Sequence, residues 1–235
     1  MDLFNRLQGI FFNPKLTLKA ISEKPIWMDT LITLLIVLTI FSFIIYPYLQ
    51  KDQIQAFKTD VQRQESMGED AYNRQLDFFE NPPQWYIILM TVVAPLVAHM
   101  IGFLLPSLII LGMGRMFSTD GSYKQVFSVY LHASIVDRIL GNAVRLVLIL
   151  IRKSVFQTTT SLAFLFPRLE ITSTAYKVLS QVDFFQLWFY GILAYGLSSV
   201  LKIDVKKGLI LSYSFWLLKT LFYIAGSLIF PQSMH

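Results

Sequence analysis

The chain has 235 residues, of which 54% are hydrophobic and only 15% carry a formal charge, whereas about 25% of the residues of an average soluble protein are charged. Its 20 Phe residues and mean hydropathy of +0.54 are typical of side chains that face hydrocarbon. The net charge is +5, and the Lys and Arg residues are scattered in small groups, which favours anionic lipid over nucleic acid as the partner of opposite charge. The absence of Cys excludes disulfides, thiolate metal sites and a Cys nucleophile.

The first 30 residues are predicted to form a cytoplasmic amphipathic segment ahead of a membrane domain at 31–235. Apolar residues recur at helical spacing from Leu3 to Phe11, and Pro14 follows Asn13 as proline does at the first position of a helix. Two short helices on the membrane surface are therefore expected. A cleaved signal peptide is not expected, because this stretch has no uninterrupted apolar run followed by a small-residue cleavage site.

The rest of the chain is dominated by long apolar stretches. A helix needs about 20 predominantly apolar residues to cross a bilayer, and it is favoured there because it pairs its own backbone amides. The stretches that meet or approach this length predict an all-α, integral membrane five-helix bundle. The predicted spans are 31–49, 85–113, 124–152, 184–201 and 208–230.

The connections between these spans predict the orientation. Residues 51–80 carry seven Asp or Glu against four Lys or Arg and are expected to form a solvated helical loop, whereas 161–167 is expected to dip into the membrane interface. With the N-terminus inside, the inner segments hold nine Lys or Arg in about 48 residues and the outer ones eight in about 70. The N-terminus is therefore predicted to be cytoplasmic and the C-terminus outside.

Ionisable residues near the middle of the predicted spans form the candidate functional cluster, namely His99, Asp137, Arg138 and Lys219. A charge at that depth costs about 2.5 to 3.5 kcal/mol, so such residues face the bundle interior and find partners. We expect Asp137 to pair with Lys219, with His99 nearby. One interpretation is a polar pathway or proton-linked site, and the alternative is a structural ion pair that fastens helices. Arg145 lies eight residues beyond Asp137 with Gly141 between them on the same face; it is expected to snorkel toward the interface, and the alternative is that this face lines a groove.

Two further sets of residues carry candidate roles. The lysines that could bind anionic lipid head groups, or that simply determine topology, are Lys15, Lys19, Lys24, Lys202, Lys206 and Lys207. The small residues interpreted as helix-packing positions are Ala94, Ala98, Gly102, Gly191 and Gly196. A contact between copies of the chain is a further option for this second set.

Several stretches resemble the Yip-domain family, named for interaction with Ypt/Rab GTPases, in its bacterial form. They are Ser161-Leu-Ala-Phe-Leu-Phe-Pro167, Val182-Asp-Phe-Phe-Gln-Leu-Trp188, Gly191-Ile-Leu-Ala-Tyr-Gly-Leu197 and Phe215-Trp-Leu-Leu218, preceded by a Pro-containing lead-in from Phe12 to Pro25. The resemblance implies five transmembrane helices with a cytoplasmic N-terminus in a bacterial inner membrane. The chain lacks the acidic Asp-Leu-Tyr-Gly-Pro signature of eukaryotic relatives, which argues against a small GTPase partner.

The sequence lacks the signatures of zinc metalloproteases, of α/β-hydrolases and of P-loop nucleotide binding, so no enzyme activity, metal or cofactor is expected. The favoured function is that of a non-enzymatic membrane protein of the Yip family, acting in membrane organisation or as a partner of other membrane proteins. The alternative is a transporter or channel subunit with a midplane polar site. Expected partners are the lipid bilayer and, as options, other membrane proteins or a second copy.

Overall fold

The structure, a computed structural model, describes residues 1–156, 160–171 and 173–229. Every regular element in these ranges is a helix, and one isolated bridge joins Ser161 to Asp183. Four helical stretches are long and apolar enough to cross a membrane, Met28–Thr59, Gln84–Gly114, Phe184–Leu201 and Val205–Ser227. The all-helical class and the membrane character are confirmed, while the count of five spans stays a prediction. Phe230, the last residue of the fifth predicted span, lies outside the described residues.

Two short helices precede the first span, α1 (Leu3–Phe12) and α2 (Pro14–Glu23). The Asp2 carboxylate caps α1 by accepting a hydrogen bond of 2.8 Å from a backbone amide of the first turn. Pro14 occupies the first position of α2, as expected, but the Asn13 side chain makes no capping hydrogen bond. The entry to α2 is therefore set by proline geometry.

The inner faces of α1 and α2 join the hydrophobic core of the bundle. A Cβ at Gly9 would overlap the Thr17 side chain, so the two helices meet closely at this glycine. The fully or almost fully buried members of the core from these helices are Ile10, Leu18 and Ile21. Arg6 is buried as well and forms an ion pair with Asp29 at the start of the next helix. The first 30 residues are thus fastened to the membrane domain.

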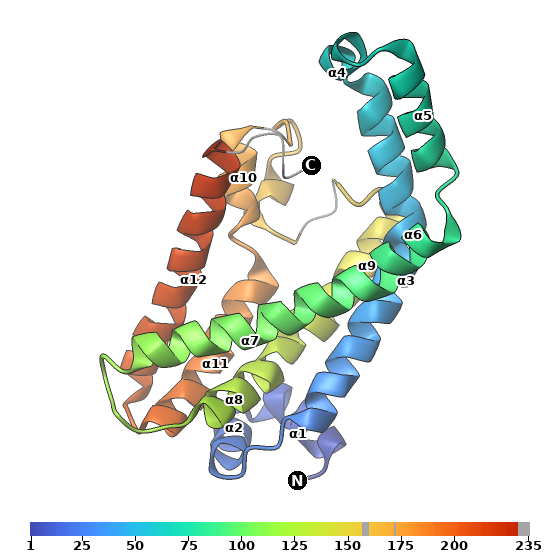
Figure 1. Cartoon of the computed structure of the whole chain (residues 1–235). Coiled ribbons are helices and arrows are strands. Elements are labelled where there is room, and N and C mark those ends of the chain that lie inside the picture. The colour runs from blue at the N-terminus through green and yellow to red at the C-terminus, as the bar shows by residue number, and fades with distance from the viewer. Residues whose placement is uncertain (157–159, 172, 230–235) are drawn as a thin grey trace.

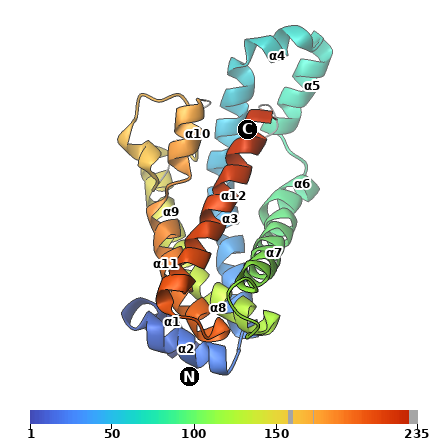
Figure 2. The same cartoon turned by 90° about the vertical axis from the view of Figure 1, so that its left-hand side faces the viewer.

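Helix α3 (Met28–Thr59) extends well beyond its predicted apolar span, and α4 (Val61–Ser66) and α5 (Glu69–Glu80) fold back beside its end. Figures 1 and 2 show this hairpin projecting from one end of the molecule. Phe57 of α3 stacks on Tyr72 of α5 with ring centroids 4.9 Å apart. Aromatic packing therefore holds together the segment predicted as a polar helical loop.

The second span is one continuous helical run made of α6 (Gln84–Ile88), the π-helical η1 (Leu89–Val93) and α7 (Ala94–Gly114). The π-turn ends two residues before Pro95, whose missing N–H cannot complete the α-helical ladder. Figure 1 shows this run crossing obliquely in front of the steeper α3 and of α12 (Val205–Ile229).

The third predicted span corresponds to a helical run of α8 (Tyr123–Ile135), the π-helical η2 (Val136–Gly141) and α9 (Asn142–Arg152). It passes from the end of the molecule that holds α1 and α2 toward the opposite end (Figures 1 and 2). Every residue from Val126 to Asp137 is buried. Neighbouring helices enclose this part of the run, so Asp137 lies within protein, whereas Lys124 and Arg152 at the two ends of the run are exposed.

Helix α11 (Phe184–Leu201) is the centre of the fold, because it packs against α2, α8 and α12. It follows the short η3 (Leu162–Leu165) and α10 (Thr174–Ser180) and ends at Lys202, whose φ of 51° is left-handed. A tight turn then reverses the chain into α12.

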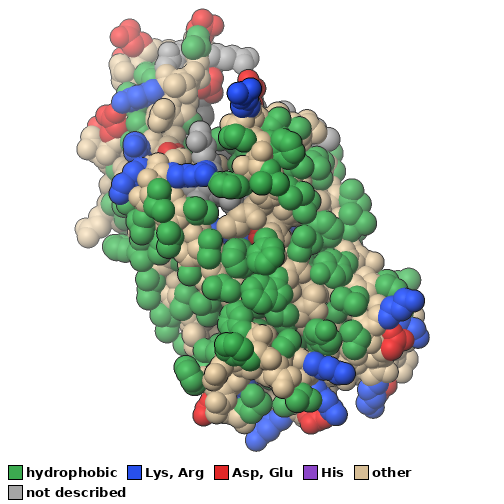
Figure 3. Space-filling model, turned by 180° about the vertical axis from the view of Figure 1, so that it is seen from behind, with side chains coloured by type: hydrophobic (Ala, Val, Ile, Leu, Met, Phe, Trp, Pro, Cys, Tyr) green, Lys and Arg blue, Asp and Glu red, His purple; other side chains and the backbone are tan. Residues whose placement is uncertain are grey.

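The surface carries an apolar zone between two charged ends. Figure 3 shows hydrophobic side chains across the middle of one face, with Lys, Arg, Asp and Glu gathered above and below. The segments at the α1–α2 end, 1–30, 115–124 and 202–207, carry nine Lys or Arg against five Asp or Glu. The segments at the other end, 51–84 and 152–182, carry eight of each. One end of the molecule is therefore clearly positive and the other balanced.

Candidate functional site

A polar cavity of about 340 Å³ lies between α7, the α8–η2–α9 run, α11 and α12. Its walls combine charged, amide and aromatic side chains from helices that are far apart in the sequence. The charged residues and the amide that line it are Asp137, Arg138, Arg145, Asp183, Gln186 and Lys219. Three of the four residues of the predicted midplane cluster therefore face one cavity, and the fourth, His99, is not among its lining residues.

Arg145 is the hub of the ionic contacts in this cavity. Its Nη2 lies 2.8 Å from Asp137 Oδ1 and 3.0 Å from Asp183 Oδ1, and Nη1 donates to Asn142 Oδ1 at 2.9 Å. The side chain is only 19% exposed. The prediction that Arg145 snorkels to the interface is wrong, because two carboxylates inside the bundle satisfy its charge.

Gly141 makes room for this arrangement. A Cβ at Gly141 would lie 3.1 Å from Arg145 Nη1 and 3.1 Å from Phe185 Cβ, which is tighter than ordinary contact. The guanidinium also lies 5.9 Å from the centroid of the Phe185 ring. The glycine thus lets α9 and the start of α11 close on the guanidinium from both sides.

Asp183 performs a second task at the start of α11. Its Oδ1 accepts hydrogen bonds from the backbone amides of Phe185 at 2.9 Å and Gln186 at 3.1 Å, and Thr160 donates to its Oδ2. Burial raises the pKa of this carboxyl, but the Arg145 charge and the hydrogen bonds from Thr160 and the Gln186 amide together bring the pKa below its usual value. The carboxyl is therefore ionised at neutral pH, as its place beside Arg145 requires.

The expected pair of Asp137 with Lys219 is not the arrangement found among the described residues. Lys219 Nζ donates to Gln186 Oε1 at 2.7 Å and lies 5.8 Å from the centroid of the Tyr190 ring. Asp137 is taken up by Arg145 and, at 3.7 Å from its Oδ2, by Arg138 Nε. Asp137 and Lys219 line the same cavity, but the Asp137 carboxylate pairs with Arg145 instead of Lys219.

The two histidines in the helical core differ sharply in their contacts. His99 stacks on Phe103 of the same helix, with ring centroids 6.4 Å apart. His132 on α8 is fully buried, with Nδ1 2.8 Å from the Ser128 carbonyl oxygen and Nε2 2.9 Å from the Thr30 hydroxyl. Nδ1 therefore donates to the carbonyl, and through Nε2 the imidazole ties α8 to α3. Sequence reasoning gave this residue no role.

The predicted packing glycines of α11 lie at close helix contacts. A Cβ at Gly196 would come to 2.8 Å of Val129 Cβ on α8, and one at Gly191 to 3.2 Å of the Tyr213 hydroxyl on α12. The small residues of α7 differ, because Ala94 and Ala98 are exposed and a Cβ at Gly102 would meet nothing within 4 Å. Within the described chain, these three small residues of α7 therefore do not lie at a close contact between helices.

The six predicted head-group lysines all belong to segments at the α1–α2 end of the molecule, and they are Lys15, Lys19, Lys24, Lys202, Lys206 and Lys207. Lys202 forms an exposed ion pair of 3.0 Å with Asp120, which joins the two turns at this end. Exposed pairs of this kind contribute about 0 to 1 kcal/mol, so they leave the surface available to anionic lipid.

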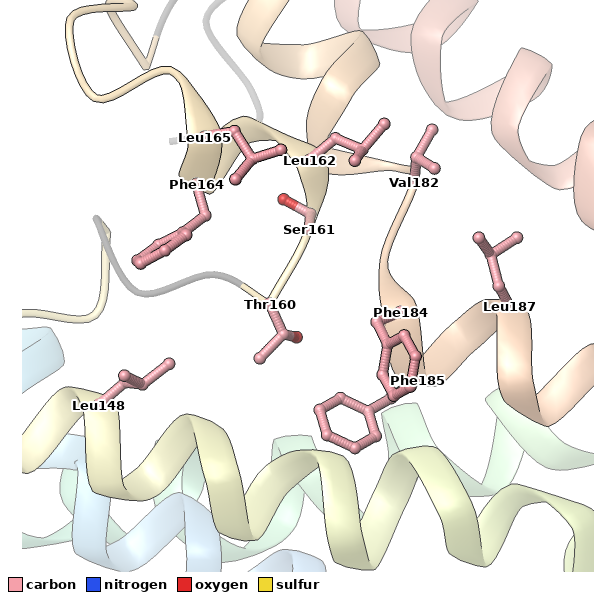
Figure 4. A pocket seen from close by; sticks show the side chains of 10 residues that line it. All are labelled: Leu148, Thr160, Ser161, Leu162, Phe164, Leu165, Val182, Phe184, Phe185 and Leu187. Carbon is pink, nitrogen blue, oxygen red and sulfur yellow. The ribbon is translucent and has the colours of Figure 1, made fainter.

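A second, apolar cavity of about 480 Å³ lies beside the polar one. Figure 4 shows its lining, in which Leu148 of α9 and the segment Thr160–Leu165 lie around the start of α11. Thr160 belongs to this lining and also contacts Asp183 and Arg145 of the polar cavity. The two cavities therefore meet at one threonine.

Long apolar helices, surface charge gathered at the two ends and ion pairs inside the bundle define a multi-pass α-helical membrane protein. The chain belongs to the Yip1 domain family, which matches residues 9–227. Members of this family are generally non-enzymatic membrane proteins. No curated protein and no solved structure matches the chain significantly.

Proposed function

We propose that this is a non-enzymatic protein of a bacterial inner membrane that organises the bilayer through its N-terminal helices. The supporting observation is the outer face of α1 and α2, where Phe4 is 73% exposed, Phe12 81% and Leu16 61%. Lys15 and Lys19 flank these side chains in the sequence. Helices that carry large apolar residues next to lysines bury that face in the head-group region of a bilayer.

The attachment of α1 and α2 supports a mechanical role. Their core residues and the ion pair of Arg6 with Asp29 hold them rigidly against the bundle, so they enter one leaflet only. Insertion of an amphipathic helix into a single leaflet is coupled to curvature and to lipid composition. The protein would therefore bend or gather the lipid around it.

The proposed topology has five spans, with the N-terminus in the cytoplasm and the C-terminus outside. It is supported by the end-to-end course of the α8–η2–α9 run and by the excess of Lys and Arg at the α1–α2 end. A compartment-specific reporter inserted at Gly68, between α4 and α5, is expected to respond as an external site. One inserted at Gly121 should respond as cytoplasmic, and the reverse pattern would contradict the topology.

A reconstitution experiment tests the proposed function. Wild-type protein in liposomes that contain anionic lipid is expected to narrow or tubulate the vesicles, as measured by electron cryomicroscopy. The double variant Phe12→Ser, Leu16→Ser should lose most of this deformation, because its outer face no longer enters the lipid. Met116→Ser is the matched control, since Met116 is 84% exposed at the same end but outside α1 and α2. Equal deformation by the double variant would contradict the proposal.

The second candidate is a transporter or channel subunit, and the observation that favours it is the polar cavity lined by Asp137, Arg138 and Lys219. Its prediction separates it from the first within the same vesicles. Ion or proton flux that is lost in Lys219→Met and kept in Lys206→Met would favour a conduit. Vesicle deformation without flux would favour membrane organisation.

A further inference from the structure

The polar cavity holds more positive than negative charge. Three cationic side chains line it, those of Arg138, Arg145 and Lys219, against the two carboxylates of Asp137 and Asp183. Its described lining therefore carries a formal charge of +1. The surplus lies among helices whose outer surfaces are apolar, where Lys219 is half-buried and the Arg138 side chain is 37% exposed.

The ion pairs show which side chains carry the surplus. Arg145 contacts both carboxylates at 3.0 Å or less, whereas Arg138 reaches only Asp137, at 3.7 Å. Lys219 Nζ has the neutral Gln186 amide oxygen as its hydrogen-bond acceptor. Among the described residues, no carboxylate lies within 4.0 Å of Lys219 Nζ. An ammonium has three donors, so this one can accommodate further acceptors.

We propose that this cavity binds an anionic group, a carboxylate or a phosphate, with Lys219 and Arg138 as its cations. A buried charge is costly unless a charge of opposite sign and hydrogen bonds compensate it, and a bound anion supplies both. Tyr130 and Tyr190 line the same cavity, and a phenol can donate a neutral hydrogen bond to an oxyanion. The volume of about 340 Å³ falls within the usual range of small-molecule sites.

The anion could be free or could be the head of an amphiphile. The apolar cavity is the reason to consider an amphiphile, because residues 182–186 at the start of α11 line both cavities. Val182, Phe184 and Phe185 line the apolar cavity, while Asp183 and Gln186 line the polar one. An anionic head among the cations would thus leave its hydrocarbon tail next to an apolar groove.

Calorimetric titration of the purified protein in a nonionic detergent tests the proposal, with sodium phosphate, oleate and the uncharged oleyl alcohol as probes. Saturable binding of phosphate or oleate is expected. Lys219→Met should weaken it about tenfold or more, because a charge-assisted hydrogen bond is lost. Lys124→Met is the control, since Lys124 is exposed on α8 and lies outside the cavity, and it should bind as the wild type does.

The three probes separate the possible outcomes. Binding of phosphate identifies a free-anion site, and binding of oleate but not phosphate identifies an anionic amphiphile. Oleyl alcohol that binds as tightly as oleate, no saturable binding of either anion, or unchanged binding in Lys219→Met would each overturn the proposal. Arg138→Gln provides a second variant should Lys219→Met fold poorly, and it too should weaken the anion. The result is independent of vesicle deformation, so either proposal can fail alone.

Discussion

Replacing Arg145 by Met is expected to lower the free energy of unfolding by about 3 to 5 kcal/mol, the usual cost of removing one partner from a buried ionic network. The substitution leaves Asp137 and Asp183 facing each other without the cation that now lies 2.8 Å from one and 3.0 Å from the other. Unfolding by denaturing detergent, followed by circular dichroism, measures the loss.

Two companion variants make this result specific to the ion triad. Arg74→Met removes an exposed arginine of α5 and should leave the stability almost unchanged. Combining Arg145→Met with Asp137→Asn and Asp183→Asn should restore part of the loss, because the two carboxylates left without a guanidinium become neutral and asparagine still caps α11. Recovery stays incomplete because Arg138 loses its pair with Asp137. If Arg145→Met is as stable as Arg74→Met, the triad does not contribute as described.

Gly208→Ala is expected to destabilise the hairpin of α11 and α12 by about 1 to 3 kcal/mol, the range for overpacking a tight interface. A Cβ there would lie 2.6 Å from the Ala194 carbonyl oxygen and 3.4 Å from Ser198 Cβ. A backbone oxygen cannot rotate away, so the two helices must separate. The same unfolding measurement detects the loss.

Gly102→Ala is the matched control for that substitution, because it adds the same methyl group to another spanning helix. Nothing lies within 4 Å of a Cβ at Gly102, so the stability should hold or rise by up to about 1 kcal/mol through the better helix propensity of alanine. Equal stabilities of Gly102→Ala and Gly208→Ala would show that close approach of the backbones is not limiting at Gly208.

The spanning helices could be predicted because lipid imposes a simple rule, a long apolar run. The stretches Met28–Thr59, Gln84–Gly114, Phe184–Leu201 and Val205–Ser227 obey it. The run from 123 to 152 does not meet it on composition, because neighbouring helices bury residues 126–137 and polar side chains there find partners within the protein. Hydropathy describes contact with the surrounding solvent, and residues 126–137 contact neighbouring helices instead, whereas α9 exposes apolar residues such as Val147 and Ile151.

The polar cavity could be predicted only in part. The position of Asp137, Arg138 and Lys219 near the middle of their predicted spans was enough to group them, because unpaired charges in a span must turn inward. The partner Asp183 lies 38 residues beyond Arg145, and no local spacing reveals such a contact. Its position directly before an apolar helix is typical of an N-cap, which was the one available signal.

The π-helical segment η2 explains why Arg145 turns inward. In an uninterrupted α-helix, two positions eight apart differ by about 80° in azimuth around the axis. A π-turn absorbs about one surplus residue, so such positions become equivalent to a separation of seven and differ by only about 20°. Asp137 and Arg145 are such a pair, since Asp137 belongs to η2 (Val136–Gly141) and Arg145 lies one turn beyond its end. Deleting one residue between Asp137 and Arg145 would leave a regular α-helix with a separation of seven, so the pair would keep its phase. An uninterrupted α-helix of unchanged length would instead turn the guanidinium about 80° away from its carboxylate.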